Sequence, residues 1–178
     1  MLRREHEQIL RAIQVALEVT RYLEQGRPLP PASLSALQQF FLFVAHRSHH
    51  DKEEELLFPL LRDKGFAEGP GCIGALLDQH EHGAEAFERM VKATEAYAEG
   101  DRTAAPVWID AARKYVEALR QHIRREEEVL LLNAERLLTD ADQQALAQEF
   151  SRVDQRAHRA GLDEVVEDFE RVARAVDR

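Results

Sequence analysis

Two short segments of the chain each carry a histidine and a glutamate four residues apart. The first has His49 and Glu53, and the second has His122 and Glu126. In a helix, residues four apart lie one above the other on the same face, so each segment points an imidazole and a carboxylate in one direction. Imidazole nitrogens and carboxylate oxygens are common metal ligands. The two segments are therefore candidate metal-binding motifs.

The two motifs belong to a larger internal repeat. Glu5-His6-Glu7 resembles Gln79-His80-Glu81, and each of these histidines precedes its motif by almost the same number of residues. The chain therefore predicts two similar helical hairpins, and a pseudo-twofold axis between them would bring the ligands of both halves to the centre. Each half contributes two histidines and one glutamate. Six such ligands suit a pair of metal ions with a bridging oxygen better than one tetrahedral zinc.

Three histidines near the first motif, His46, His49 and His50, are each candidate ligands. The alignment of the two halves pairs His49 with His122, whereas it places His50 opposite Ile123. We therefore expect His49 to be the ligand and His50 to be peripheral. His46 falls on the inward face one turn earlier, where it fits either a hydrogen-bonding neighbour of the ligands or an interior histidine with its own partner.

Other residues near the motifs have two interpretations each. Tyr115 lies two turns before the second motif on the same face, so its hydroxyl could reach the metals, but a half-buried tyrosine of a bundle core fits the same pattern. Four glutamates next to the motifs fit either a solvated helix face or partners of the ligand histidines: Glu54, Glu55, Glu127 and Glu128. Cys72 is the one cysteine of the chain, so no intrachain disulfide can form. We expect its side chain to be small and buried rather than a metal ligand or a nucleophile.

The hydrophobic spacing predicts long helices that could position these motifs. Ser33 and Thr139 are candidate N-caps, and Pro59 is expected to kink the last turns of the second helix. The predicted helices cover about 2–25, 33–65, 73–99, 101–138 and 140–160, with a final helical stretch after Gly161.

These helices predict an all-α fold. We expect an up-and-down four-helix bundle over residues 1–138 and a helical extension, 139–178, packed on that bundle. The composition agrees, because the chain is rich in strong helix formers and has only 8 glycines and 6 prolines.

The charge and hydropathy of the chain exclude several functions. The net charge is −9, and no basic stripe is present, so we expect no nucleic-acid partner. No apolar run approaches the roughly 20 residues of a membrane span, and the first residues lack the apolar stretch of a signal peptide. We expect a cytoplasmic protein, monomeric or homodimeric, without a membrane partner.

Taken in order along the chain, the motifs resemble the hemerythrin-like, or HHE cation-binding, family. The resemblance spans residues 5 to about 132 and implies a four-helix bundle that holds an oxo- or hydroxo-bridged pair of iron ions. The ligand types are also compatible with zinc or manganese. The segments that carry the resemblance are Glu5-His6, His49 to Pro59, Gly71 to Gly74 with His80-Glu81, Tyr115, and His122 to Glu126. The implied ligands are His6, His49, Glu53, His80, His122 and Glu126.

Two functions are compatible with this resemblance. A third possibility is a helical protein whose histidines bind no metal. The first is a di-iron protein that handles or senses oxygen, nitric oxide or iron. The alternative is an enzyme that reduces nitric oxide or peroxide. Oxygen carriers of the family have a further histidine one turn after the third-helix ligand, where this chain has Ala84. The small side chain predicts an open position at one iron and disfavours oxygen transport.

Overall fold

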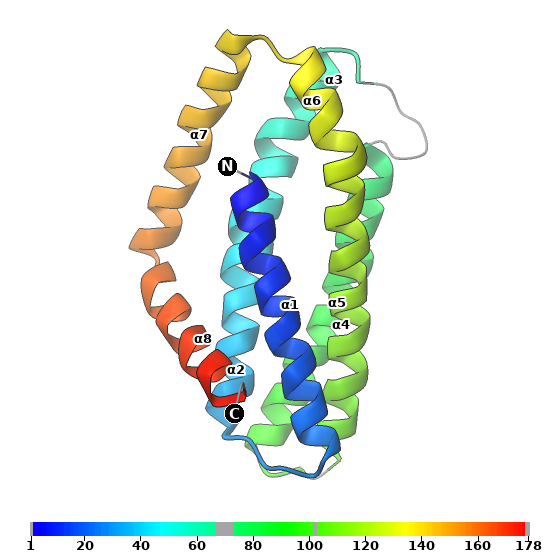
Figure 1. Cartoon of the computed structure of the whole chain (residues 1–178), viewed down its shortest axis with the longest axis vertical. Helices are drawn as coiled ribbons and strands as arrows, with labels where there is room; N and C mark the ends of the chain where they lie inside the picture. The colour runs from blue at the N-terminus through cyan, green and yellow to red at the C-terminus, as the bar shows by residue number, and fades with distance from the viewer. Residues whose placement is uncertain (1, 67–72, 102, 177–178) are drawn as a thin grey trace.

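The chain folds into helices that run up and down along one long axis. The computed structural model describes residues 2–66, 73–101 and 103–176, and this part of the chain contains helices and no strand. Within it, four antiparallel arms form a bundle, and two further helices run along its side (Figure 1). The all-α bundle predicted from the sequence is confirmed. Among the described residues, no helix is both long enough and apolar enough to cross a lipid bilayer.

The arms consist of helical segments joined end to end. The first and third arms are single α-helices, α1 (Leu2–Glu24) and α4 (Ile73–Ala98). The other two alternate between α-helix and π-helix, the wider form with one more residue in each hydrogen-bonded turn. The second arm comprises α2 (Pro31–Phe40), η1 (Phe41–His50), η2 (Glu53–Leu57) and α3 (Phe58–Asp63). The fourth comprises α5 (Ala104–Arg125), η3 (Glu126–Leu130) and α6 (Leu131–Leu137).

The apolar core is divided into two parts along the bundle axis. The larger part includes Trp108, and the smaller part, near α3 and α6, includes Phe58. On α1, Leu2 belongs to the smaller part and Ile9 to the larger, and the buried His6 lies between them. A layer of buried polar side chains therefore interrupts the core, and the apolar parts on both sides hold its backbone in place.

Two helix starts test the predicted caps. The Thr139 hydroxyl accepts a hydrogen bond from the Asp142 N–H at 3.2 Å, and the Asp142 carboxylate accepts one from the Thr139 N–H at 2.9 Å. This reciprocal capping box confirms Thr139 as a cap. The expectation for Ser33 was wrong, because α2 already begins at Pro31. Proline is favoured in a first helical turn, which leaves Ser33 inside the helix rather than at its start.

The C-terminal helices α7 (Asp140–Arg159) and α8 (Leu162–Val176) lie along the side of the bundle (Figure 1). α8 packs against α1 and α2, and the Phe169 ring lies 4.2 Å from the Phe40 ring between centroids. α7 packs against η1 and η2, close to the polar layer. The division of the chain at residue 138 remains a prediction, although α8 contributes side chains to the larger part of the core.

Candidate metal centre

All four arms contribute to the polar layer. Its six predicted ligands are buried, and each is at most 8% exposed. The first arm carries one of them, the second carries two, the third carries one and the fourth carries two. They are His6 on α1, His49 on η1, Glu53 on η2, His80 on α4, His122 on α5 and Glu126 on η3.

The Glu126 carboxylate lies between two pairs of histidines. Its Oε2 atom is 2.9 Å from Nε2 of His6 and 3.4 Å from Nε2 of His49. Its Oε1 atom is 2.9 Å from Nε2 of His122, whose Nε2 is in turn 2.9 Å from Nε2 of His80. One carboxylate thus faces both histidine pairs, with a different oxygen toward each pair.

The Glu53 carboxylate completes the layer from the opposite arm. Its Oε2 atom lies 3.5 Å from Nε2 of His80, 3.7 Å from Nε2 of His122 and 3.8 Å from Nε2 of His49. All four predicted histidines therefore point Nε2 toward the two carboxylates. The sequence repeat brings its two halves together, as the alignment of the hairpins leads one to expect.

The donor atoms of this layer fit a bound cation. Neither oxygen of Glu53 has a hydrogen bond of normal geometry within the described residues, and the same holds for Nε2 of His6 and Oε1 of Glu126. A buried carboxylate without hydrogen bonds is costly, and a cation between the carboxylates would remove that cost. Ligand atoms of His49, Glu53, His122 and Glu126 all lie within 4.8 Å of one another. Nitrogen and oxygen donors in this mixture suit iron, zinc or manganese.

The electrostatics of the layer favour positive charge. Burial lowers the pKa of His122, but the Glu126 and Glu53 carboxylates outweigh it and raise the pKa to about 9. Burial also lowers the pKa of His49, yet Glu53, Glu126 and Glu5 raise it well above its ordinary value. Burial raises the pKa of Glu126, and its histidine neighbours bring it well below the usual range. A proton on these imidazoles occupies the place where a metal cation would bind.

A second set of carboxylates contacts the outer side of the histidines. Nδ1 of His6 lies 2.6 Å from Oε1 of Glu127, and Nδ1 of His80 lies 2.5 Å from Oε1 of Glu54. Each glutamate directly follows the glutamate of a motif, so the contact occurs once in each half. An Nδ1–H that donates to a carboxylate leaves Nε2 free to bind a metal and fixes the ring orientation. Glu54 and Glu127 are therefore partners of the histidines, whereas Glu55 and Glu128 lie on exposed helix faces.

Sequence reasoning assigned no role to Lys52 and treated Glu5 only as a neighbour of His6, yet Glu5 contacts His49 and Lys52 contacts Glu5. Nδ1 of His49 lies 3.2 Å from Oε2 of Glu5, and the fully buried Lys52 ammonium donates to the other Glu5 oxygen and to Asp154 on α7. Burial raises the pKa of Glu5, but His49 and Lys52 outweigh it and lower the pKa. The available signal was a lysine on the inward side of the first motif, which needs an acidic partner when buried.

The structure corrects the expectation for His50. This residue was expected to be peripheral, but it is 7% exposed, and its ring stacks on that of His80 at 3.8 Å between centroids. A ring nitrogen of His50 and the ligand atoms of His80 and His122 all lie within 4.8 Å of one another. Burial, followed by the neighbouring histidines, lowers the pKa of His50 well below its ordinary value. The imidazole is therefore neutral, which is the form that binds a metal.

The small residue beside the site is also different from the expected one. Ala84 is exposed, whereas Gly83 is buried and lines a cavity of about 10 Å³ together with His80, His122 and Tyr115. A cavity of this size has room for about one water molecule. The expectation that Ala84 leaves space at the site was wrong, because Ala84 is exposed and the small residue that lines the cavity is Gly83.

His46 contacts Tyr115, which lines this cavity. The Tyr115 hydroxyl and Nε2 of His46 are hydrogen-bonded at 3.0 Å, and Tyr115 is fully buried. Burial, with a smaller contribution from His80, lowers the pKa of His46 to about 4. A direct role of this pair at the metals remains a prediction. Cys72 lies outside the described residues.

The glutamates of both motifs begin π-helical turns at equivalent places in the repeat. Glu53 is the first residue of η2 and Glu126 is the first residue of η3. Isolated π turns within α-helices are frequent at functional sites. Because each motif glutamate begins a π-helical turn, the two halves resemble each other at this point in backbone conformation as well as in residue type.

Comparison with known proteins places the chain in a family. The family model described as the hemerythrin HHE cation binding domain matches residues 1–132. Because this match covers most of the chain, and the site gathers buried histidines and glutamates that could hold a metal, the chain belongs to the hemerythrin HHE cation-binding family. Comparisons with curated proteins and with solved structures gave no match.

Proposed function

We propose that the chain holds two iron ions in the polar layer and uses them to handle or sense oxygen, nitric oxide or iron. The observation that carries this proposal is the position of Glu126. One of its oxygens contacts His6 and His49, and the other contacts His122, which adjoins His80. A carboxylate with this placement can serve two metal ions at once. The proposed ligands are the six residues of the layer.

The residues around the layer support this function in three ways. The outer carboxylates orient the imidazoles, the two parts of the core exclude bulk water, and the cavity beside Gly83 leaves room for a small molecule. A bound pair of iron ions would supply redox chemistry and affinity for a diatomic ligand. The protein groups determine which small molecules reach it.

Anaerobic loading of the purified chain with Fe(II) tests the proposal. We expect two tightly bound iron ions in the wild type, and a loss of at least one of them in Glu126→Gln and in Glu53→Gln. The matched control is Glu128→Gln, because Glu128 follows the same motif but lies exposed and accepts from Arg124 at 2.8 Å. A single iron ion in the wild type, or equal loading of all four proteins, would contradict the proposal.

Exposure of the loaded protein to nitric oxide or oxygen tests the second part. We expect a change in the visible absorption spectrum that depends on the iron pair and that is missing in Glu126→Gln. An unchanged spectrum with both gases would leave iron storage or iron sensing as the function and would exclude gas handling.

A further inference from the structure

A continuous series of polar contacts joins α7 to one histidine of the metal layer. The Asp154 carboxylate on α7 accepts a hydrogen bond from the Lys52 ammonium, which is fully buried. The same ammonium donates to Oε1 of Glu5, and Oε2 of Glu5 lies 3.2 Å from Nδ1 of His49. The ammonium also lies 5.8 Å from the centroid of the Phe150 ring on α7. Two side chains of the bundle therefore connect a helix outside it to the His49 imidazole.

The other half of the repeat lacks this series within the described residues. The positions that correspond to Glu5, Lys52 and His49 are Gln79, Arg125 and His122. Oε1 of Gln79 and Nδ1 of His122 are buried there without a hydrogen bond, and Arg125 lines a pocket between α4 and α5. The asymmetry follows from α7, which packs against η1 and η2, on either side of Lys52.

The contacts of Lys52 make the orientation of His49 depend on α7. A carboxylate that contacts the far nitrogen of a metal-binding imidazole fixes the orientation of the ring, and Glu5 occupies this place at His49. Glu5 is in turn held by the buried ammonium, whose second carboxylate partner is Asp154. A buried ammonium that loses one of its two carboxylates is unfavourable. The ammonium and the Glu5 carboxylate can then shift, and the His49 ring with them.

The acidic residue of α7 lies outside the part of the chain that the family model matches, because that match ends at residue 132. We propose that Asp154 acts through Lys52 to position His49, so that α7 sets the metal affinity on the His49 side of the layer. This assignment rests on the proposed pair of metal ions. A displacement of α7 then weakens one metal position and leaves the other unchanged, which makes the C-terminal extension a control element of the site.

The test compares three variants of the full chain with the wild type. Asp154→Asn removes the charge and keeps the size of the side chain. Leu146→Ala is the control for packing, because Leu146 lies on the same helix and packs against the smaller part of the core. Glu149→Gln is the control for charge, because the Glu149 carboxylate pairs with Arg152 within α7.

Heteronuclear NMR of the histidine side chains in the metal-free chain is the first readout. We expect the ring nitrogen signals of His49 to shift in Asp154→Asn and those of His122 to stay in place. Both controls should keep the wild-type signals. An unchanged His49 signal in folded Asp154→Asn would overturn the proposal. An equal change in Leu146→Ala would overturn it as well, because the packing of α7 alone would then be responsible.

Iron affinity, measured by chelator competition after anaerobic Fe(II) loading, is the second readout. We expect one of the two ions to bind about 10-fold more weakly in Asp154→Asn, with the other ion and both controls as in the wild type. An equal loss for both ions would overturn the assignment to one side. A wild type that binds no pair of ions would instead overturn the proposed function. The metal-free His49 signal still decides the role of Asp154 in that case, so the two failures are distinguishable.

Discussion

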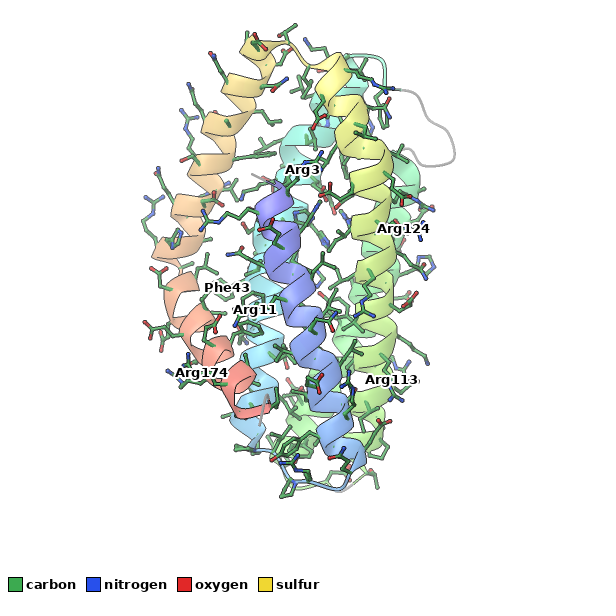
Figure 2. All side chains as sticks on the ribbon, in the orientation of Figure 1. Arg3, Arg11, Phe43, Arg113, Arg124 and Arg174 are labelled. Atoms are coloured by element: carbon green, nitrogen blue, oxygen red, sulfur yellow. The ribbon has the colours of Figure 1, made fainter. Side chains whose placement is uncertain are left out.

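Nδ1 of His6 lies 2.6 Å from Oε1 of Glu127, on the side of the ring away from the Glu126 carboxylate. Arg3 donates to the other oxygen of the same carboxylate, near the N-terminal end of α1 (Figure 2). The carboxylate is therefore fixed by a cation and can hold the imidazole in one tautomer and one orientation. We therefore expect the affinity of the site for a metal to depend on Glu127, although Glu127 is not one of the proposed ligands.

Replacement of this carboxylate tests its role. We expect Glu127→Ala to weaken iron binding by about 10- to 100-fold while the chain stays folded. Chelator competition measures the affinity, and circular dichroism monitors the fold. The control is Glu128→Ala, whose partner Arg124 projects outward from α5 (Figure 2). Equal affinity of the two variants would show that Glu127 does not orient His6.

The raised pKa of His122 predicts how the stability of the metal-free protein depends on pH. The folded-state pKa is about 9 against an ordinary value of 6.5, so the folded chain binds the proton more tightly than the unfolded chain. The stability gained is complete below about pH 6.5 and is lost as the pH rises through 9. We expect a loss on the order of 2–3 kcal/mol over this range.

Urea unfolding of the metal-free chain at several pH values between 6 and 10 measures this loss. The iron-loaded chain should behave differently, because metal binding displaces the proton and gains affinity as the pH rises. Stability of the metal-free chain that does not fall above pH 6.5 would contradict the raised pKa.

The ion pair between Lys52 and the buried Glu5 should contribute more to stability than the ion pair between Lys52 and Asp154. Lys52→Met leaves the buried Glu5 carboxylate without its cation, and we expect a loss of about 3–5 kcal/mol in the free energy of unfolding. Asp154→Asn should cost about 1 kcal/mol or less, because the Asp154 side chain is 36% exposed. Chemical denaturation provides both values.

A double variant separates the two possible causes. If the unpaired carboxylate is responsible, Lys52→Met combined with Glu5→Gln should recover part of the loss. Equal stability of Lys52→Met and Asp154→Asn would instead show that the buried contact with Glu5 contributes little.

Replacement of Gly83 by alanine should raise the stability of the protein but reduce the access of small molecules to the site. A Cβ atom built there meets no atom within 4 Å, so Gly83→Ala should stabilise α4 by about 0.5–1 kcal/mol. Because Gly83 lines the cavity beside His80 and His122, its replacement should also slow the reaction of the iron-loaded protein with nitric oxide. Thermal unfolding and stopped-flow absorption measure the two effects.

The matched control exchanges the neighbouring residue. Ala84→Gly should destabilise the helix by a similar amount and leave the reaction with nitric oxide unchanged, because Ala84 is exposed. If both variants react like the wild type, the cavity is not the route by which the gas reaches the site.

The repeat in the sequence was sufficient to predict that the six proposed ligands lie close together, because equal separations of the same residue types place them at equivalent points of two similar hairpins. It failed at His50, since the alignment judged this residue by its partner Ile123, a core residue of the other half. Both His49 and His50 lie in the π-helical segment η1, and a π turn contains one more residue than the α turn on which a spacing of four relies. The face of a residue inside such a segment cannot be assigned from that spacing.

The contacts between side chains of different arms could also not be predicted from the sequence. Lys52 and Asp154 are far apart in the chain, and the charge pattern of α7 does not reveal which acidic residue faces the bundle. Glu5 was visible only as a neighbour of His6, yet its carboxylate contacts the histidine of another arm. These contacts depend on how the arms pack, which local periodicity does not determine.

Mössbauer spectroscopy of the full chain, loaded anaerobically with Fe(II) and then oxidised, tests the central claim most directly. If Glu126 and Glu53 hold two ions in one layer, the spectrum should account for two iron ions in each chain, with their spins coupled to each other. One iron ion in each chain, or two ions that behave as isolated centres, would contradict the claim that this polar layer is a di-iron site.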